Sequence, residues 1–139
     1  MYLVKQLNGA TQSITQAGSS FKPFALVAAL EQGIPLSSIW SGKSPQVFDD
    51  FGKPYPVFNY SNEQEKEINL TYATAHSINT VYVPLGIAAG LENVVDVARR
   101  AGIPTSVALM PTPSISLGVA SPHVIDMAAA YATFAANGI

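Results

Sequence analysis

Ser19 and Lys22 lie three positions apart in residues 18–24 (GSSFKPF), where the sequence predicts the start of a helix. At this spacing two side chains share one helix face, one turn apart. The pair can therefore hold an amine next to a hydroxyl, which an activated serine needs. Behind it, the apolar run 24–30 (FALVAAL) predicts a buried helix start, where a lysine does little for solubility. The alternative is an ordinary solvated helix face.

A second group with chemical potential is Ser77-Ile78-Asn79, 58 residues after Ser19, where a predicted helix ends. A hydroxyl in a tight connection can relay a proton, and a carboxamide can bond both a lysine and a substrate amide. Serine and asparagine are also common at helix ends, so this motif by itself could equally be an ordinary helix end without a chemical role.

The composition favours a chain that packs on further structure. Of its 139 residues only 12% are charged, against the typical ~25%, while 48% are apolar. A net charge of −2 without a basic stripe argues against nucleic acid as a partner. The absence of cysteine excludes disulfides and thiolate metal sites, and His76 and His123 lack a metal-binding spacing. We expect no metal or cofactor. The sequence shows no signal peptide and no apolar run of the roughly 18–20 residues that a membrane span needs.

The elements that must position these residues are mostly helices. Glycine, proline and the apolar periodicity predict helices over residues 19–32, 69 or 70 to 77, 79 or 80 to 89, 91–100 and 121–136. Asn79 or Thr80 is the expected cap of the third, and Ser121 with Pro122 the expected start of the last. Residues 46–48 and 56–58 flank a turn and predict a short hairpin. Residues 8–18 and 59–67 are expected to be loops, and residues 103–120 a loop around one short turn. The predicted class is mainly α.

Taken together, the motifs closely resemble those of penicillin-binding proteins, especially the transpeptidase domain of the class A, bifunctional type. Residues 18–24 resemble the active-serine motif, and residues 75–81 (AHSINTV) resemble the second, Ser-x-Asn, motif. Residues 8–12 (NGATQ) resemble the segment that leads into the serine. Residues 116–118 (SLG) and 124–135 (VIDMAAAYATFA) resemble a later helix. The similarity spans about residues 8–139 in four ordered matches.

This resemblance implies a role for each matching residue. Ser19 would be the nucleophile, acylated by a peptidoglycan stem peptide or by a β-lactam, with its N–H as half of an oxyanion hole. Lys22 would be the base, Ser77 would pass a proton to the leaving group, and Asn79 would orient Lys22 and bind the substrate backbone. The implied fold is the helical portion of the α/β penicillin-binding/serine β-lactamase-like transpeptidase fold. The parent would be membrane-anchored and work at the extracytoplasmic face of the bacterial cell membrane.

One departure from the family limits the expected activity. The third motif, Lys-Ser/Thr-Gly on a strand edge, does not occur, and residues 41–43 (SGK) have the wrong order and place. We therefore expect residues 1–139 to form a partial transpeptidase domain without its flanking sheet strands. Another chain or segment would supply that sheet, and this chain alone is expected to show little or no turnover.

Three interpretations stay open from the sequence. They are part of a D,D-transpeptidase, a non-catalytic β-lactam-binding or sensing module, and an inactive structural fragment. A serine β-lactamase is disfavoured, because Glu65 and Asn69 precede the Ser-x-Asn motif, whereas the corresponding glutamate motif follows it there. His76 is expected to be a helix-end residue and His123 a solvated one in the first turn of the last helix. The aromatic residues of segment 40–60 are expected to pack a small core rather than line a groove.

Overall fold

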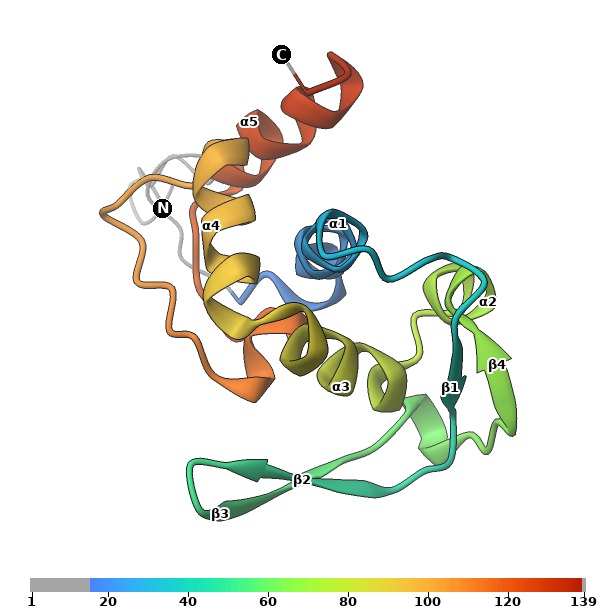
Figure 1. Cartoon of the computed structure of the whole chain (residues 1–139). Helices are drawn as coiled ribbons and strands as arrows, with labels where there is room; N and C mark the ends of the chain where they lie inside the picture. The colour runs from blue at the N-terminus through green and yellow to red at the C-terminus, as the bar shows by residue number, and fades with distance from the viewer. Residues whose placement is uncertain (1–15, 139) are drawn as a thin grey trace, which may run out of the picture.

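Helices surround one apolar core in the computed structural model, which describes residues 16–138, and short strands lie to one side (Figure 1). The α-helices are α1 (Lys22–Glu31), α2 (Leu70–Ala75), α3 (Asn79–Ala89), α4 (Leu91–Ala101) and α5 (Val124–Ala135). The 3-10 turns are η1 (Gly18–Phe21), η2 (Tyr60–Asn62) and η3 (Pro113–Leu117). The strands are β1 (Ile39–Ser41), β2 (Gln46–Asp50), β3 (Lys53–Val57) and β4 (Glu67–Asn69). The predicted mainly helical class is confirmed, while the expected loop at residues 8–18 lies largely outside the described residues.

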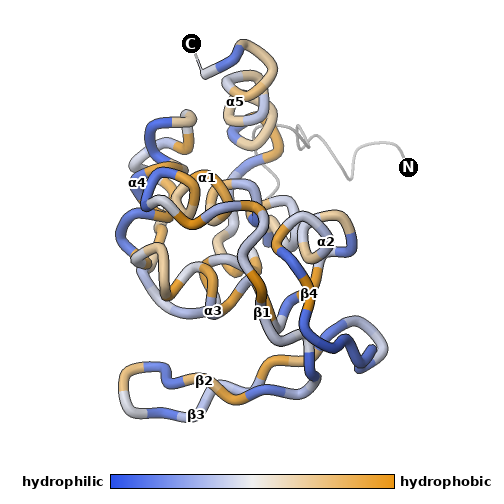
Figure 2. The backbone as a smooth tube through the Cα atoms, turned by 45° about the vertical axis from the view of Figure 1, so that its right-hand side comes forward, coloured by the Kyte–Doolittle hydropathy of each residue, from blue (hydrophilic) through white to orange (hydrophobic). Residues whose placement is uncertain are grey.

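Helix α1 runs through the centre of the helical cluster and contacts both α3 and α4. Phe21 and Phe24 stack edge to face, with ring centroids 4.7 Å apart, and both are fully buried. Small residues on the same helix let the neighbouring helices approach closely, because alanine adds little volume beyond the backbone. Figure 2 shows apolar backbone positions gathered on α1 and α3. Burial of this helix start, predicted from the apolar run behind Ser19, is confirmed.

The strands form two separate antiparallel pairs. The predicted hairpin is confirmed: β2 pairs with β3 in a register that places Phe48 opposite Tyr55. The pairing of β1 with β4, which places Trp40 opposite Ile68, was not predicted. It lies partly in the expected loop 59–67, because three-residue strands carry too short a pattern to show a period of two.

The predicted starts of α3 and α5 were wrong. Helix α5 begins at Val124 rather than at Ser121-Pro122, with His123 as its N-cap. The His123 N–H donates to the Asp126 carboxylate at 2.9 Å, as in a capping box, so the acid three residues on fixes the start. Helix α3 has Ile78 as its N-cap, and Asn79 is its first residue because its side chain is engaged in tertiary contacts.

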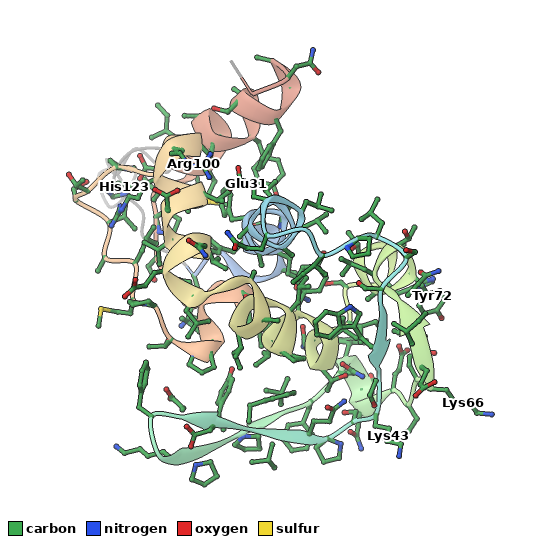
Figure 3. The ribbon with its side chains drawn as sticks, viewed as in Figure 1. Glu31, Lys43, Lys66, Tyr72, Arg100 and His123 are labelled. Atoms are coloured by element: carbon green, nitrogen blue, oxygen red, sulfur yellow. The ribbon has the colours of Figure 1, made fainter. Side chains whose placement is uncertain are left out.

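Helix α5 packs on the rest of the chain along only part of its surface. Of its residues only Ala130 is buried, while Val124 is 56% and Ile125 49% exposed. Figure 1 shows α5 extending away from the cluster of α1, α3 and α4. An ion pair of 2.6 Å between Arg100 and Glu31 joins α4 to α1 on the same side (Figure 3). Helix α5 therefore carries exposed apolar side chains.

Within residues 16–138 no single helix is long and apolar enough to cross a membrane. Helices α3 and α4 meet that criterion only as a pair, bent by 93°.

Candidate active site

The four predicted site residues meet at the amino group of Lys22. Its Nζ lies 3.1 Å from Ser19 Oγ, 2.7 Å from Ser77 Oγ and 2.7 Å from Asn79 Oδ1. The carbonyl oxygen of Ser77 lies 3.0 Å away. Two motifs that are 58 positions apart in the sequence thus surround one nitrogen atom.

The spacing of Ser19 and Lys22 fits the local backbone. Ser19 lies on η1 and Lys22 is the first residue of α1, so the segment that joins them is a 3-10 turn rather than the α-helix predicted from residue 19. Side chains at i and i+3 eclipse one another in a 3-10 turn. Ser19 is exposed, whereas Lys22 is only 4% exposed. The hydroxyl is accessible to a ligand while the amine beneath it is shielded from water.

Burial lowers the pKa of Lys22 from 10.5 to about 8. The oxygens around its Nζ belong to hydroxyl, carbonyl and amide groups, which are neutral. The ring of Tyr82 lies 5.6 Å from the same nitrogen. Contacts with these oxygens and with the ring favour the ammonium. Because none of these groups carries a negative charge, the loss of hydration on burial outweighs them. The site therefore favours the neutral amine more than water does.

Ser77 and Asn79 are held by an irregular connection between α2 and α3. Ser77 has a φ of 55°, a left-handed conformation that non-glycine residues rarely adopt. This conformation directs both its hydroxyl and its carbonyl to Lys22. Asn79 donates from Nδ2 to the carbonyl oxygen of Phe58 at 2.9 Å, which fixes the amide with its Oδ1 toward Lys22.

The turn that carries Ser19 is tied to a distant segment by backbone hydrogen bonds. Ala17 N–H donates to Ala120 O and Gly18 N–H donates to Gly118 O, both at 2.9 Å. Gly118 has a φ of +75°, and a Cβ on it would lie 2.0 Å from Gly18 O and 2.3 Å from Gly18 N. Only glycine fits at this crossing.

Gly118→Ala should therefore destabilise the chain and displace the Ser19 turn. The left-handed backbone costs an alanine about 1–2 kcal/mol, and the overlap with Gly18 adds to this cost. We expect a lower midpoint of thermal unfolding, followed by circular dichroism. Gly33→Ala is the matched control, since its φ is +84° but no atom lies within 4 Å of the added Cβ. Equal losses in both variants would contradict a role for the Gly18 contact.

A cleft opens beside the Lys22 group. It is lined by Ser19, Phe58, Asn59, Tyr60, Glu63, His76, Ser77 and Asn79. The sequence analysis predicted Ser19, Ser77 and Asn79 but missed Asn59 and Glu63, because nothing in the local pattern marks them. Phe58 and Tyr60 are exposed, so these two aromatic residues line the cleft rather than a small core, contrary to expectation.

The remaining candidates lie around the cleft or outside it. His76 contacts the cleft and stacks on Tyr72, with ring centroids 4.0 Å apart. Glu65 accepts a hydrogen bond from the Tyr72 hydroxyl at 2.9 Å, which raises the pKa of Tyr72. Asn69 caps α2 by accepting from the Tyr72 N–H at 2.7 Å. Glu65 and Asn69 thus have structural partners and do not line the cleft.

Metal-ligand groups are not found in the described part of the chain. Within residues 16–138, no three His, Asp or Glu side chains gather in a way that could hold a metal ion.

Comparison with known proteins identifies the family of this chain. The family model described as the penicillin binding protein transpeptidase domain matches residues 3–139. The chain belongs to this family. Penicillin-binding protein 1A of Aquifex aeolicus is 33% identical over 138 residues, 99% of this chain and 19% of the relative. Penicillin-binding protein 1A of Mycobacterium tuberculosis is 39% identical over 142 residues, 92% of this chain and 17% of the relative. The family type is thus class A, and the chain spans less than a fifth of these relatives.

Solved structures agree with this assignment. The penicillin-binding protein PonA1 from Mycobacterium tuberculosis matches with a TM-score of 0.85 at 38% identity, over 97% of this chain and 37% of that structure. A second structure, PonA1 in complex with penicillin V, matches with a TM-score of 0.83 at 37% identity, over 97% of this chain and 38% of that structure. The predicted fold, the helical portion of the transpeptidase fold, is confirmed.

Proposed function

We propose that this chain is part of a peptidoglycan D,D-transpeptidase that works through a serine acyl-enzyme and is acylated by β-lactams. The observation that carries the proposal is the Lys22 amine, buried and surrounded by Ser19, Ser77 and Asn79. Membership of the transpeptidase family and the likeness to PonA1, whose structure with penicillin V is known, support it.

The geometry suggests how the residues would act. Ser19 Oγ attacks the carbonyl carbon of the penultimate D-Ala of a stem peptide, and its proton passes to the neutral Lys22 amine. The tetrahedral intermediate collapses as the C–N bond to the terminal D-Ala breaks. Ser77 Oγ, 2.7 Å from Lys22, relays the proton to the leaving nitrogen. With a β-lactam the same attack opens the ring, and the leaving nitrogen stays attached to the adduct.

The acyl group then goes to the amine of a second stem peptide. Asn79 holds Lys22 in place and presents its amide toward the substrate backbone, and the Ser19 N–H donates to the developing oxyanion. The partners are therefore peptidoglycan stem peptides and β-lactam antibiotics, at the extracytoplasmic face of the bacterial cell membrane. No nucleic acid or cofactor enters this scheme.

We further propose that residues 1–139 form a partial domain. The exposed apolar residues of α5 and the match to only 37% of the PonA1 structure support this view. A sheet from another chain or segment would cover α5 and supply the Lys-Ser/Thr-Gly motif with the second oxyanion donor. Little or no turnover of a D-Ala-D-Ala substrate or a thioester is expected from the chain alone.

Mass spectrometry of the intact chain after incubation with penicillin tests the proposal. A gain of one whole penicillin mass supports a serine acyl-enzyme, whereas an unchanged mass at saturating drug counts against it. Turnover assays in the presence of a chain with the Lys-Ser/Thr-Gly strand then separate an enzyme from a sensing module, which would be acylated without turnover.

The rate of acylation should depend on pH through Lys22. Only the neutral amine accepts the Ser19 proton, and burial lowers its pKa to about 8. The second-order rate constant should therefore rise about tenfold per pH unit below pH 8 and level off above it. Stopped-flow measurements with a chromogenic cephalosporin between pH 6 and 10 check this profile. A rise that continues to pH 10 would mean that Lys22 titrates as an ordinary exposed lysine.

A further inference from the structure

Asn59 is a buried amide at the edge of the cleft, and its hydrogen-bonding capacity is fully used. It is 5% exposed. Its Nδ2 donates to the carbonyl oxygens of Gly42 at 3.0 Å and Glu63 at 3.1 Å. Its Oδ1 accepts from the N–H of Thr80 at 3.0 Å and from the Thr80 hydroxyl at 3.1 Å. A carboxamide offers two donors and two acceptor sites, so every one is occupied.

The contact with Thr80 replaces a helix cap that the sequence lacks. The N-cap residue of α3 is Ile78, which has no side-chain acceptor for the free N–H groups of the first turn. Asn59, 21 positions earlier, supplies that acceptor to the second residue of the helix. Helix α3 is therefore capped from outside its own segment.

The capped turn includes Asn79, which contacts Lys22. Asn79 precedes Thr80 directly, and its Nδ2 donates to the carbonyl oxygen of Phe58, the residue before Asn59. Asn59 thus fixes the amide of Asn79 from two directions, through the helix on one side and through its own backbone neighbour on the other. The Oδ1 of that amide lies 2.7 Å from Lys22 Nζ.

The segment that carries Asn59 is itself anchored by a polar network. The Asn59 N–H donates to Ser44 Oγ at 2.9 Å, and Ser44 Oγ donates to Asn62 Oδ1 at 2.6 Å. Gln64 bonds Ser44 through both atoms of its side-chain amide. Gly42 lies so close to Glu65 that a Cβ would come within 2.4 Å of the Glu65 Cβ. These contacts hold the backbone from Phe58 to Tyr60 in place, so Asn59 is fixed relative to Thr80.

We propose that Asn59 is a positioning residue for acylation, which caps α3 from a distant segment and thereby holds Asn79 against Lys22. The proposal rests on the function proposed above. It assigns Asn59 no contact with the reacting atoms; its effect passes through Asn79.

Acylation kinetics of Asn59→Ala test the proposal. We expect the second-order rate constant with a chromogenic cephalosporin to fall about 10-fold to 100-fold, because small misplacements of a catalytic group have effects of this size. Asn93→Ala is the matched control. It removes an amide that lies outside the cleft and donates to Ala89 O at 2.8 Å, so the acylation rate should stay unchanged. Circular dichroism establishes that both variants are folded.

A double-mutant cycle distinguishes positioning from a general loss of stability. In an Asn79→Ala background, Asn59→Ala should change the rate less than about twofold, because the residue through which it acts is gone. Its effect on the unfolding midpoint should remain. An effect on the rate that is equally large in both backgrounds would overturn the proposal.

Asn59→Asp provides a second test if the alanine variant does not fold. Aspartate keeps an acceptor for the Thr80 N–H but cannot donate to the Gly42 and Glu63 carbonyl oxygens, so the unfolding midpoint should fall. Because the helix cap itself is kept, the acylation rate of the folded variant should stay within about fivefold of the parent chain. If the folded Asn59→Asp variant is acylated as slowly as Asn59→Ala, the capping role is overturned. Where Asn59→Ala does not fold, a rate for Asn59→Asp more than about 10-fold below that of the parent chain overturns it. Absence of acylation in the parent chain would overturn both proposals, whereas normal acylation of Asn59→Ala would overturn only this one.

Discussion

Ser19→Ala should give a folded chain that forms no covalent adduct with penicillin at any pH. The Ser19 hydroxyl is the exposed oxygen 3.1 Å from the Lys22 amine, and alanine leaves no atom there that can carry an acyl group. Because Ser19 is exposed, its removal should leave the unfolding midpoint unchanged. Mass spectrometry of the intact protein, with a peptide digest of the labelled parent chain, measures both the loss and the position of the adduct.

Ser20→Ala is the matched control, one position along the same turn. Its hydroxyl donates to the Ala17 carbonyl at 2.5 Å and makes none of the contacts to Lys22, so this variant should keep the adduct. An adduct of the same mass on Ser19→Ala would show that another residue is the nucleophile. Loss of the adduct in both variants would instead indicate a general effect on the turn.

Lys22→Met should lower the rate of acylation by about 10²–10⁴-fold, the range for removal of a general base. Methionine fills a similar volume but has no lone pair basic enough to take the Ser19 proton. Lys22→Arg is the informative comparison, since arginine keeps a positive charge but cannot be deprotonated in this pH range. Both variants should be slow. Acylation at the parent rate in Lys22→Arg would mean that the charge, rather than the base, is what matters.

The same substitution should also change how stability depends on pH. The pKa of Lys22 is lower in the folded chain, about 8, than the 10.5 of an exposed lysine, so the unfolded chain binds more protons between these values. The parent chain should therefore gain about 3 kcal/mol of stability from this group as pH rises from 8 to 10.5. Below pH 8 this contribution is absent and the buried ammonium is a cost.

Lys22→Met lacks this titration, so the free energy of unfolding of the parent chain minus that of the variant should rise by about 3 kcal/mol between pH 8 and pH 10.5. Urea unfolding at several pH values measures that difference, and titrations common to both chains cancel in it. A difference that does not change with pH would contradict the lowered pKa.

Local patterns in the sequence predicted the parts of the site that depend on short spacings. Ser19 and Lys22 are three positions apart and share one turn, and the hairpin β2–β3 needs only a nearby turn. The two motifs could be joined only through the family resemblance, since no local rule brings residue 77 to residue 22.

Features that depend on distant partners were missed. Asn59 is an unremarkable loop residue in the sequence, and its importance comes from Thr80, which lies 21 positions later. The β1–β4 pair similarly joins residues 39–41 to residues 67–69. The start of α5 was predicted wrongly for another reason. Ser121-Pro122 is a good start signal, but the hydrogen bond from the His123 N–H to the Asp126 carboxylate stabilises a start at Val124 more.

The crossing of Gly18 with Gly118 has a consequence for how the chain folds. The segment with the proposed nucleophile is completed by hydrogen bonds to residues synthesised about a hundred positions later. Contacts of such long sequence separation form slowly, because closing a large loop precedes any gain from the contact. On the ribosome, η1 and α1 emerge early but wait for residues 118–120 before Ala17 and Gly18 find their acceptors. The turn that carries Ser19 therefore matures only after residues 118–120 have been synthesised, and a nascent chain stalled before residue 118 should not form the acyl-enzyme proposed above.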